Sequence, residues 1–234
     1  MSEIWNKYTT DWSYHTEQVM KFNNLSGNDL KDHTILVDLY RKLCIEEAEE
    51  ALAAHKVEDI RGNKITDGQA LNDLVDAACD LFYVGTYYSY LNIGSTPFRN
   101  YRSLCRTMEK LQVWCSNPTV FEEHEVPYDI SISLLNILEV NTSEALNKVH
   151  ESNLSKFIDV TGIPLEDINE IAETEVEEIK QGYKAKGKAL KEVTYQVNPY
   201  GDEHWLTFYN ENGKVLKPSG FFEPDFTDII KHLL

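Results

Sequence analysis

Acidic residues occur at two places where the sequence otherwise predicts buried helices. The first group lies within LCIEEAEEALAA and the second within LNDLVDAACDLFYV. Residues three or four positions apart share one face of a helix, so each group presents several carboxylates side by side. Carboxylate oxygens are the ligands that Mg²⁺ and other hard divalent cations prefer. The residues concerned are Glu46, Glu47, Glu50, Asp73, Asp76 and Asp80.

The first group interrupts an apolar helical face. Leu36, Tyr40 and Leu43 lead to Glu47 and Glu50 in steps of three and four residues. We therefore expect Glu47 and Glu50 to replace core residues, and buried charge without a counter-charge is costly. A bound cation would remove that cost. The alternative is a solvated charged face, which is what a Glu-rich helical patch usually forms.

Two packed helices would bring the two acidic groups together and form a cup of carboxylate oxygens. Such a cup suits one or two Mg²⁺ ions, which usually keep several waters and complete their shells with substrate phosphate oxygens. A carboxylate that is not fully engaged with metal could accept a proton from the attacking water.

Composition limits the choice of partners. The chain has 234 residues with 42% hydrophobic content, enough for one core, and its net charge of -17 argues against binding polymeric nucleic acid. A free nucleotide stays possible, because Mg²⁺ can lie between two anions. No apolar run has the length of a membrane span and no signal peptide is recognised, so we expect a cytoplasmic protein (host cytoplasm if viral). The four cysteines lack metal-binding spacing and are expected to be reduced thiols.

The rest of the sequence predicts mainly helices. The expected fold is all-α: a helical bundle over residues 1–185, with an insertion at about 95–140, followed by a β-hairpin and short helix at 186–234 that pack on the same domain. ENG at 211–213 signals the hairpin. The stretch 116–128 reads as a loop, and 130–138 is ambiguous between helix and strand. Helices are expected at about 3–25, 34–55, 66–92, 97–115, 141–157, 164–181 and 226–234.

Four segments of this chain resemble the MazG-type all-α nucleoside triphosphate pyrophosphohydrolases. EEAEE at 46–50 matches that family's EExxE element, and DAACD at 76–80 is similar to a form of its second element found in phage and phosphoribosyl-ATP-pyrophosphohydrolase-like members. Ala77 stands where many relatives have Glu, so Asp76 or Asp73 would supply that ligand. KVHESNLSK at 148–156 is similar to the branch's VHxSNxSK segment. The closing segment, GKVLKP at 213–218 together with GFFEPD at 220–225, also looks like that of this branch.

The resemblance implies a bundle of the all-α pyrophosphohydrolase type and a hydrolase that cleaves a (deoxy)nucleoside triphosphate into the monophosphate and pyrophosphate. It implies Mg²⁺ as cofactor, with Mn²⁺ as a possible substitute, and a homodimer or homotetramer. Asn153 and Lys156 would contact the substrate. The implied metal ligands are Glu46, Glu47, Glu50, Asp76 and Asp80, with Glu46 and Glu47 as the catalytic pair.

Three further possibilities stay open. Tyr83, Tyr87 and Tyr90 continue the stripe of Asp76 and Asp80, and they would either stack on a nucleotide base or pack in the core. The substrate could instead be phosphoribosyl-ATP, which would use the same metal ligands. The chain could also be a non-enzymatic acidic helical module that binds a protein partner.

Overall fold

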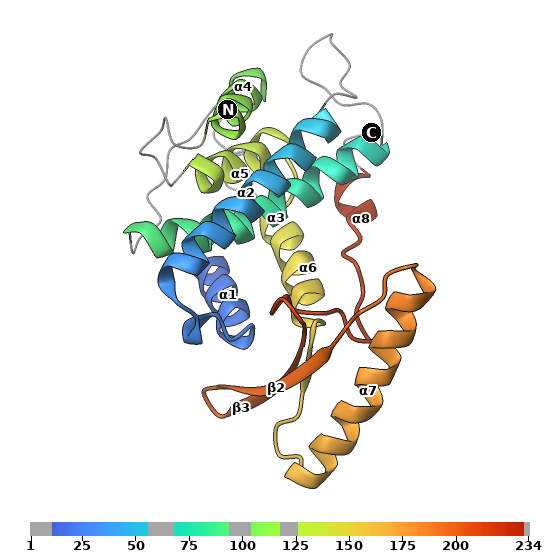
Figure 1. The fold of residues 1–234 in the computed structure, drawn as a ribbon. Helices are drawn as coiled ribbons and strands as arrows, with labels where there is room; N and C mark the ends of the chain where they lie inside the picture. Colours follow the sequence, from blue (N-terminus) through green and yellow to red (C-terminus); the bar gives the residue numbers. More distant parts are fainter. Residues whose placement is uncertain (1–10, 56–67, 94–103, 118–125, 232–234) are drawn as a thin grey trace. The chain divides into compact units, whose positions relative to one another are not determined.

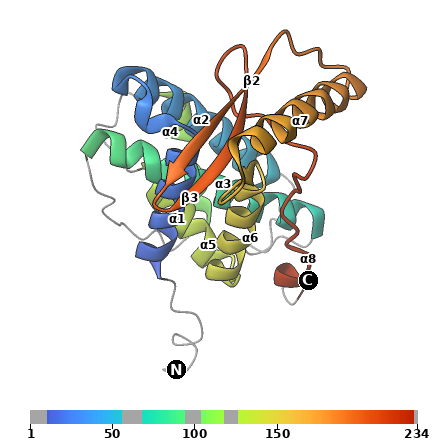
Figure 2. The ribbon, with the colours of Figure 1, turned by 90° about the horizontal axis from the view of Figure 1, so that it is seen from below.

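The computed structural model describes residues 11–55, 68–93, 104–117 and 126–231. These residues are mostly helical with one small antiparallel sheet, as expected (Figures 1 and 2). They form two compact units, one containing residues 1–19, 31–149 and 224–234, the other residues 20–30 and 150–223. The helices are α1 Trp12–Leu25, α2 His33–His55, α3 Gly68–Ile93, α4 Leu104–Ser116, α5 Val126–Ile137, α6 Thr142–Leu154, α7 Leu165–Ala185 and α8 Thr227–Ile230, with a short 3-10 helix η1 at Asn28–Leu30.

Side-chain caps fix where three of these helices begin. The Oδ1 atom of Asp11 accepts hydrogen bonds from two backbone N–H groups in the first turn of α1, and Asp32 does the same for α2. Asn141 and Glu144 form a reciprocal pair at the start of α6, where a helix was expected from about residue 141. The first residues of the helix expected at about 66–92 lie outside the described residues, and the side chain of Cys105 is not described either.

The core of the first unit is built around α3. Helices α2 and α5 both pack against it, and α4 packs on α2 and α5. A Cβ added at Gly85 of α3 would lie 2.8 Å from the backbone N of Tyr128, so the absence of a side chain allows α5 to approach closely. The ambiguous stretch 130–138 is thus largely helical. Helix α5 already begins inside the expected loop 116–128, with Pro127 in its first turn, a position that proline favours.

The second unit contains a sheet with strand order β1-β3-β2. β2 Val193–Tyr200 pairs with β3 Glu203–Asn210 across Gly201 and Asp202, and β1 Phe157–Asp159 pairs with the other edge of β3. Helix α7 covers the sheet through Ile168, Ala172 and Ile179, which pack with Leu206 and Phe208. The expected helical domain of residues 1–185 included α7, but α7 belongs with the sheet.

Three details of this unit differ from expectation. The helix expected to run through Phe157 ends at Leu154, because Phe157 pairs with Thr207 of β3. The segment after ENG forms only an isolated bridge, between Tyr209 and Val215, so the main hairpin is β2–β3. Helix α7 continues past Gly182 to Ala185, because a single glycine lowers helix stability without ending the helix.

Buried hydrogen bonds tie residues 20–30 to this sheet. The backbone O of Leu25 accepts hydrogen bonds from Asn198 Nδ2 at 2.7 Å and from Thr207 Oγ1 at 2.9 Å. Asn198 Nδ2 also contacts the Tyr209 hydroxyl at 3.0 Å. Because these polar groups are buried, their bonds are costly to break, and they hold the early segment against strands far along the chain.

Across the residues that the structure describes, no helix combines the length and the apolar character needed to cross a membrane.

Candidate functional site: an acidic group between α2 and α3

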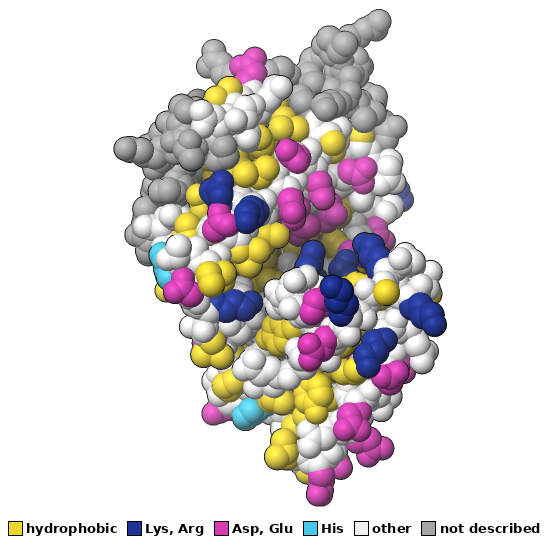
Figure 3. All heavy atoms as spheres, viewed as in Figure 1, with side chains coloured by type: hydrophobic (Ala, Val, Ile, Leu, Met, Phe, Trp, Pro, Cys, Tyr) yellow, Lys and Arg dark blue, Asp and Glu magenta, His cyan; other side chains and the backbone are white. Residues whose placement is uncertain are grey.

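Small side chains let α2 and α3 pack closely. Ala48 and Ala51 of α2 are fully buried, and Ala77 and Ala78 of α3 are at most 3% exposed. The separation of two packed helices depends on the side chains at the contact, and alanine permits a short one. The acidic residues beside these alanines are thereby brought near one another. Figure 3 shows Asp and Glu side chains gathered on the face of this unit.

The acidic residues flank the core, and they do not replace it. Glu47 is half-buried, whereas Glu46 and Glu50 are exposed. The expectation that both Glu47 and Glu50 occupy core positions is therefore wrong for Glu50. The buried face of α2 runs instead from Tyr40 through Cys44 and Ala48 to Ala51, one position away from the predicted face. Alanine can fill this contact without the burial of a charge, so the carboxylates lie at the edge of the contact.

Four other acids surround Glu47. Its pKa is raised from 4.5 to about 8, first because the side chain is partly removed from water, then because of the nearby Asp80, Glu50, Glu46 and Asp76. With Glu47 they are the five residues that the sequence nominated as ligands, and four of them lie near enough for their charges to act on Glu47. Asp73 is not among the groups that act on Glu47. Its carboxylate accepts a hydrogen bond from Gln69 at 2.6 Å.

A hard divalent cation fits this group in chemistry and charge. The donors are carboxylates, and every charged group that shifts the pKa of Glu47 has the same sign. Asp76 and Asp80 are half-buried, and the buried Oδ1 of Asp76 receives no hydrogen bond from the described residues, although other interactions hold this residue. The acids do not form a preformed metal-coordination site. In the part of the chain that is described, no three His, Cys, Asp or Glu side chains are arranged as metal ligands.

The tyrosines beside this group differ in exposure. Tyr83 is only 5% exposed, and Tyr87 packs against Tyr40 with ring centroids 4.7 Å apart. Tyr90 is 48% exposed and stacks on Tyr87. Of the two possibilities left open for it, Tyr87 packs in the core. Tyr83 offers a ligand little accessible surface in this conformation.

The predicted substrate residues Asn153 and Lys156 belong to the second unit, at the end of α6. Asn153 is buried, and its side-chain oxygen accepts a hydrogen bond from Lys156 Nζ at 2.6 Å. The closing segment lies beside them: Ser152 Oγ donates to the backbone O of Phe222 at 2.8 Å. Two segments singled out in the sequence, 148–156 and 213–225, thus meet through residues of this unit.

Sequence reasoning missed Glu175 of α7. Glu175 is 8% exposed, and its carboxylate accepts two hydrogen bonds from Ser219 of the closing segment. Glu175 lies in a helix with many solvated glutamates, and its burial depends on a residue 44 positions later. No local pattern distinguishes it from its neighbours.

Comparison with known proteins gives no match, whether with protein-family models, with curated proteins or with solved structures.

Proposed function

We propose that this protein is a Mg²⁺-dependent nucleoside triphosphate pyrophosphohydrolase. The observation that supports it is that four other carboxylates of α2 and α3 act electrostatically on the half-buried Glu47. A concentration of like charge costs stability unless a cation accompanies it, so it points to a ligand and not to a structural role. The resemblance of these segments to MazG-type enzymes supplies the reaction: release of pyrophosphate from a (deoxy)nucleoside triphosphate.

The residues would have distinct roles. Glu46, Glu47, Glu50, Asp76 and Asp80 would hold the metal, which when bound stabilises negative charge on phosphate oxygens and acidifies water. Without metal, burial and the neighbouring acids raise the pKa of Glu47. A bound cation would favour its ionised form, which can accept a proton from the attacking water. In the same proposal the protein is a homodimer or homotetramer.

The direct test is a pyrophosphate-release screen over all ribo- and deoxynucleoside triphosphates, dUTP and phosphoribosyl-ATP included, with Mg²⁺ or Mn²⁺. Glu47→Gln and Glu50→Gln should each lower kcat/KM at least about 100-fold, a typical loss for a residue that acts in the transition state. Glu49→Gln is the matched control. Glu49 is exposed on the same helix and is not among the groups that act on Glu47, so this variant should keep activity within about twofold.

Two outcomes would overturn the proposal. One is normal turnover by a folded Glu47→Gln protein. The other is the absence of pyrophosphate release from every nucleotide, which together with absent Mg²⁺ binding in calorimetry would favour a protein-binding module. Turnover of phosphoribosyl-ATP alone would keep the chemistry and change the substrate.

A further inference from the structure

Strand β2 forms one edge of the sheet in the second unit. The strand order is β1-β3-β2, so β3 pairs with one side of β2, and no second strand among the described residues pairs with the other side. An edge strand directs the backbone N–H and C=O groups of alternate residues away from its sheet. The outer side of β2 therefore presents backbone groups with which another strand could pair.

β2 lacks most of the features that keep sheet edges apart. Its sequence, VTYQVNPY, contains no charged residue, and its one proline lies next to its last residue. Its register with β3 is continuous from Val193 to Tyr200, so no bulge interrupts it. Natural edge strands are commonly protected by charge, by a bulge or by short length, and β1 at the opposite edge has only three residues. β2 is therefore the edge of this sheet that is suited to pairing.

A strand added beside β2 would cover apolar side chains as well as backbone. Val193 and Val197 are only partly buried against the core cluster of α7 and the sheet, and Tyr195 between them is 37% exposed. Alternate residues of a strand share one face, so these three side chains form a row on the face that α7 covers. A neighbouring strand would supply cross-strand contacts to this row.

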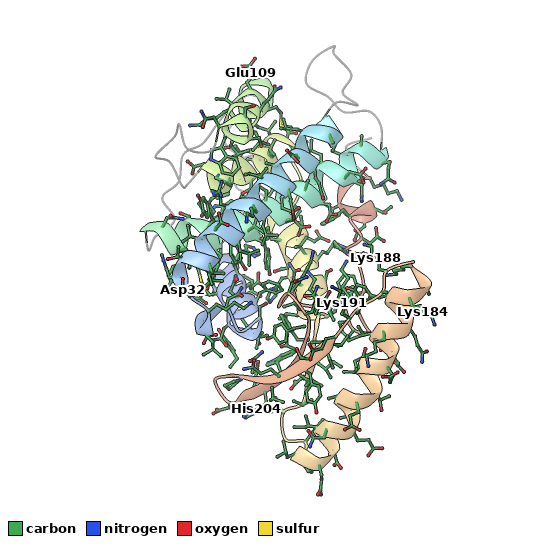
Figure 4. All side chains as sticks on the ribbon, viewed as in Figure 1. Asp32, Glu109, Lys184, Lys188, Lys191 and His204 are labelled. Carbon is green, nitrogen blue, oxygen red and sulfur yellow. The ribbon has the colours of Figure 1, made fainter. Side chains whose placement is uncertain are left out.

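The two ends of β2 differ in charge. Residues 184–191, which lead towards the strand, contain four lysines and no acidic residue, although the chain has a net charge of -17. Glu192 follows them, so this end stays positive. The other end is negative, because the turn after β2 contains Asp202 and is followed by Glu203. Figure 4 shows Lys188 and Lys191 towards one end of the sheet and His204, beside the turn, towards the other.

This arrangement of charge favours an antiparallel pair of two copies. In a pair related by a two-fold axis, the beginning of each strand lies beside the end of the other strand. The lysines of each copy would then lie near Asp202 of the other copy, whereas a parallel pair would place like charges together. Lys188 and Asp202 are both exposed, and neither forms an ion pair within the part of the chain that the structure describes.

We propose that β2 is the surface through which two copies of this chain associate, by antiparallel pairing of β2 with β2 of the second copy. The two sheets would form one continuous sheet, with α7 of both copies on the same face. Pro199 has no N–H to donate, so we expect the pairing to centre on residues 193–197. That the copies associate rests on the proposed function, which includes a homo-oligomer, whereas the choice of β2 depends only on this unit.

The first test is sedimentation equilibrium of the full chain over a range of concentrations at low salt. Tyr195→Lys should raise the dissociation constant of the assembly at least about tenfold, because a lysine on an edge strand opposes pairing with a second strand. Thr174→Lys is the matched control. It adds the same charge to an exposed position of α7 and should leave the dissociation constant within about twofold. Circular dichroism shows whether each variant is folded.

A charge exchange tests the antiparallel arrangement. Lys188→Glu and Asp202→Lys should each weaken association about threefold, and the double variant should return to within about twofold of wild type. Within one molecule the two residues are separated by all eight residues of β2, or roughly 26 Å, so recovery would arise between copies. If net charge alone mattered, Asp202→Lys would strengthen the association of this acidic chain.

Three outcomes would overturn the inference. They are a wild-type chain that is monomeric at every concentration, an assembly that Tyr195→Lys leaves unchanged, and stronger association of Asp202→Lys. Glu47→Gln should associate like wild type. Loss of pyrophosphate release with unchanged association would therefore concern the proposed catalysis, and failure of the β2 variants to weaken association would concern only this interface.

Discussion

Glu47 in the helical unit and Glu203 in the sheet unit are the same residue type with opposite changes in pKa. Burial and four neighbouring acids raise the pKa of Glu47 to about 8. Hydrogen bonds from Lys21 and Trp205 lower the pKa of Glu203. The sheet unit therefore supplies the hydrogen-bond donors that stabilise ionised Glu203. At Glu47, the neighbouring carboxylates instead disfavour the ionised form.

This difference separates two uses of a carboxylate. A carboxylate with a paired lysine contributes to the fold and needs nothing more. A carboxylate surrounded by others stores unfavourable energy, which the binding of a cation would release. Acidic patches are common in proteins. The patch at Glu47 differs because burial and like charge raise the pKa of this residue, whereas the pKa of Glu203 in the sheet unit is lowered.

The largest effect expected from this difference is on stability against pH, without divalent metal. The pKa of Glu47 is higher folded than unfolded, so its favourable contribution is complete below about pH 4.5 and is lost as pH rises to about 8. The full shift corresponds to about 5 kcal/mol, and water reaching the half-buried side chain reduces this to about 3 kcal/mol. Urea unfolding should show Glu47→Gln equal to wild type at pH 5 and more stable at pH 9. Equal stability of wild type and Glu47→Gln at pH 9 would contradict the inference that ionised Glu47 destabilises the fold.

A smaller effect is expected from magnesium. Since Mg²⁺ favours the ionised form of Glu47, saturating Mg²⁺ should raise the free energy of unfolding at pH 7 by about 2 kcal/mol and release about one proton per site. Calorimetry in two buffers of different ionisation enthalpy measures the proton release. Glu49→Gln should respond like wild type, and Glu47→Gln should lose the proton release. Equal proton release by both variants would place it on another group.

The smallest effect is expected at Glu203. Its pKa is lowered in the folded protein, so it stabilises the fold above its unfolded pKa, and this stabilisation disappears as pH falls through the folded pKa. Glu203→Gln should cost less than about 1 kcal/mol at pH 7, because the ion pair with Lys21 is partly exposed. The cost should vanish at pH 2. Thermal unfolding of wild type and Glu203→Gln at the two pH values would show whether the change in stability with pH has the opposite sign to that expected for Glu47→Gln.

Helices α2 and α3 could be predicted closely from the sequence. Their apolar periodicity is long, and their observed bounds lie within two residues of expectation. The sequence also indicated that Glu46, Glu50, Asp76 and Asp80 would lie near enough to Glu47 for their charges to raise its pKa, because helical spacing places each set on one side of its helix. The exact buried face of α2 could not be predicted, since it depends on the packing of Ala48 and Ala51 at the contact with α3.

The second unit was less predictable because its contacts join distant residues. Strand β1 has three residues and is a strand only because Phe157 to Asp159 pair with β3. Helix α7 has a strongly amphipathic sequence, but nothing in it indicates that its apolar face covers Leu206 and Phe208. The burial of Glu175 likewise depends on Ser219, which local periodicity does not reveal.

The attachment of Leu25 to Asn198 and Thr207 has a consequence for how the chain is made and handled. A nascent chain that has emerged only as far as α6 carries residues 20–30 without the strands that complete them. No contiguous fragment consists of one unit alone, so a chain cut at residue 150 or 185 would expose apolar surface in both pieces. Expression and any circular permutation are therefore best planned with the entire chain kept intact between α1 and α8.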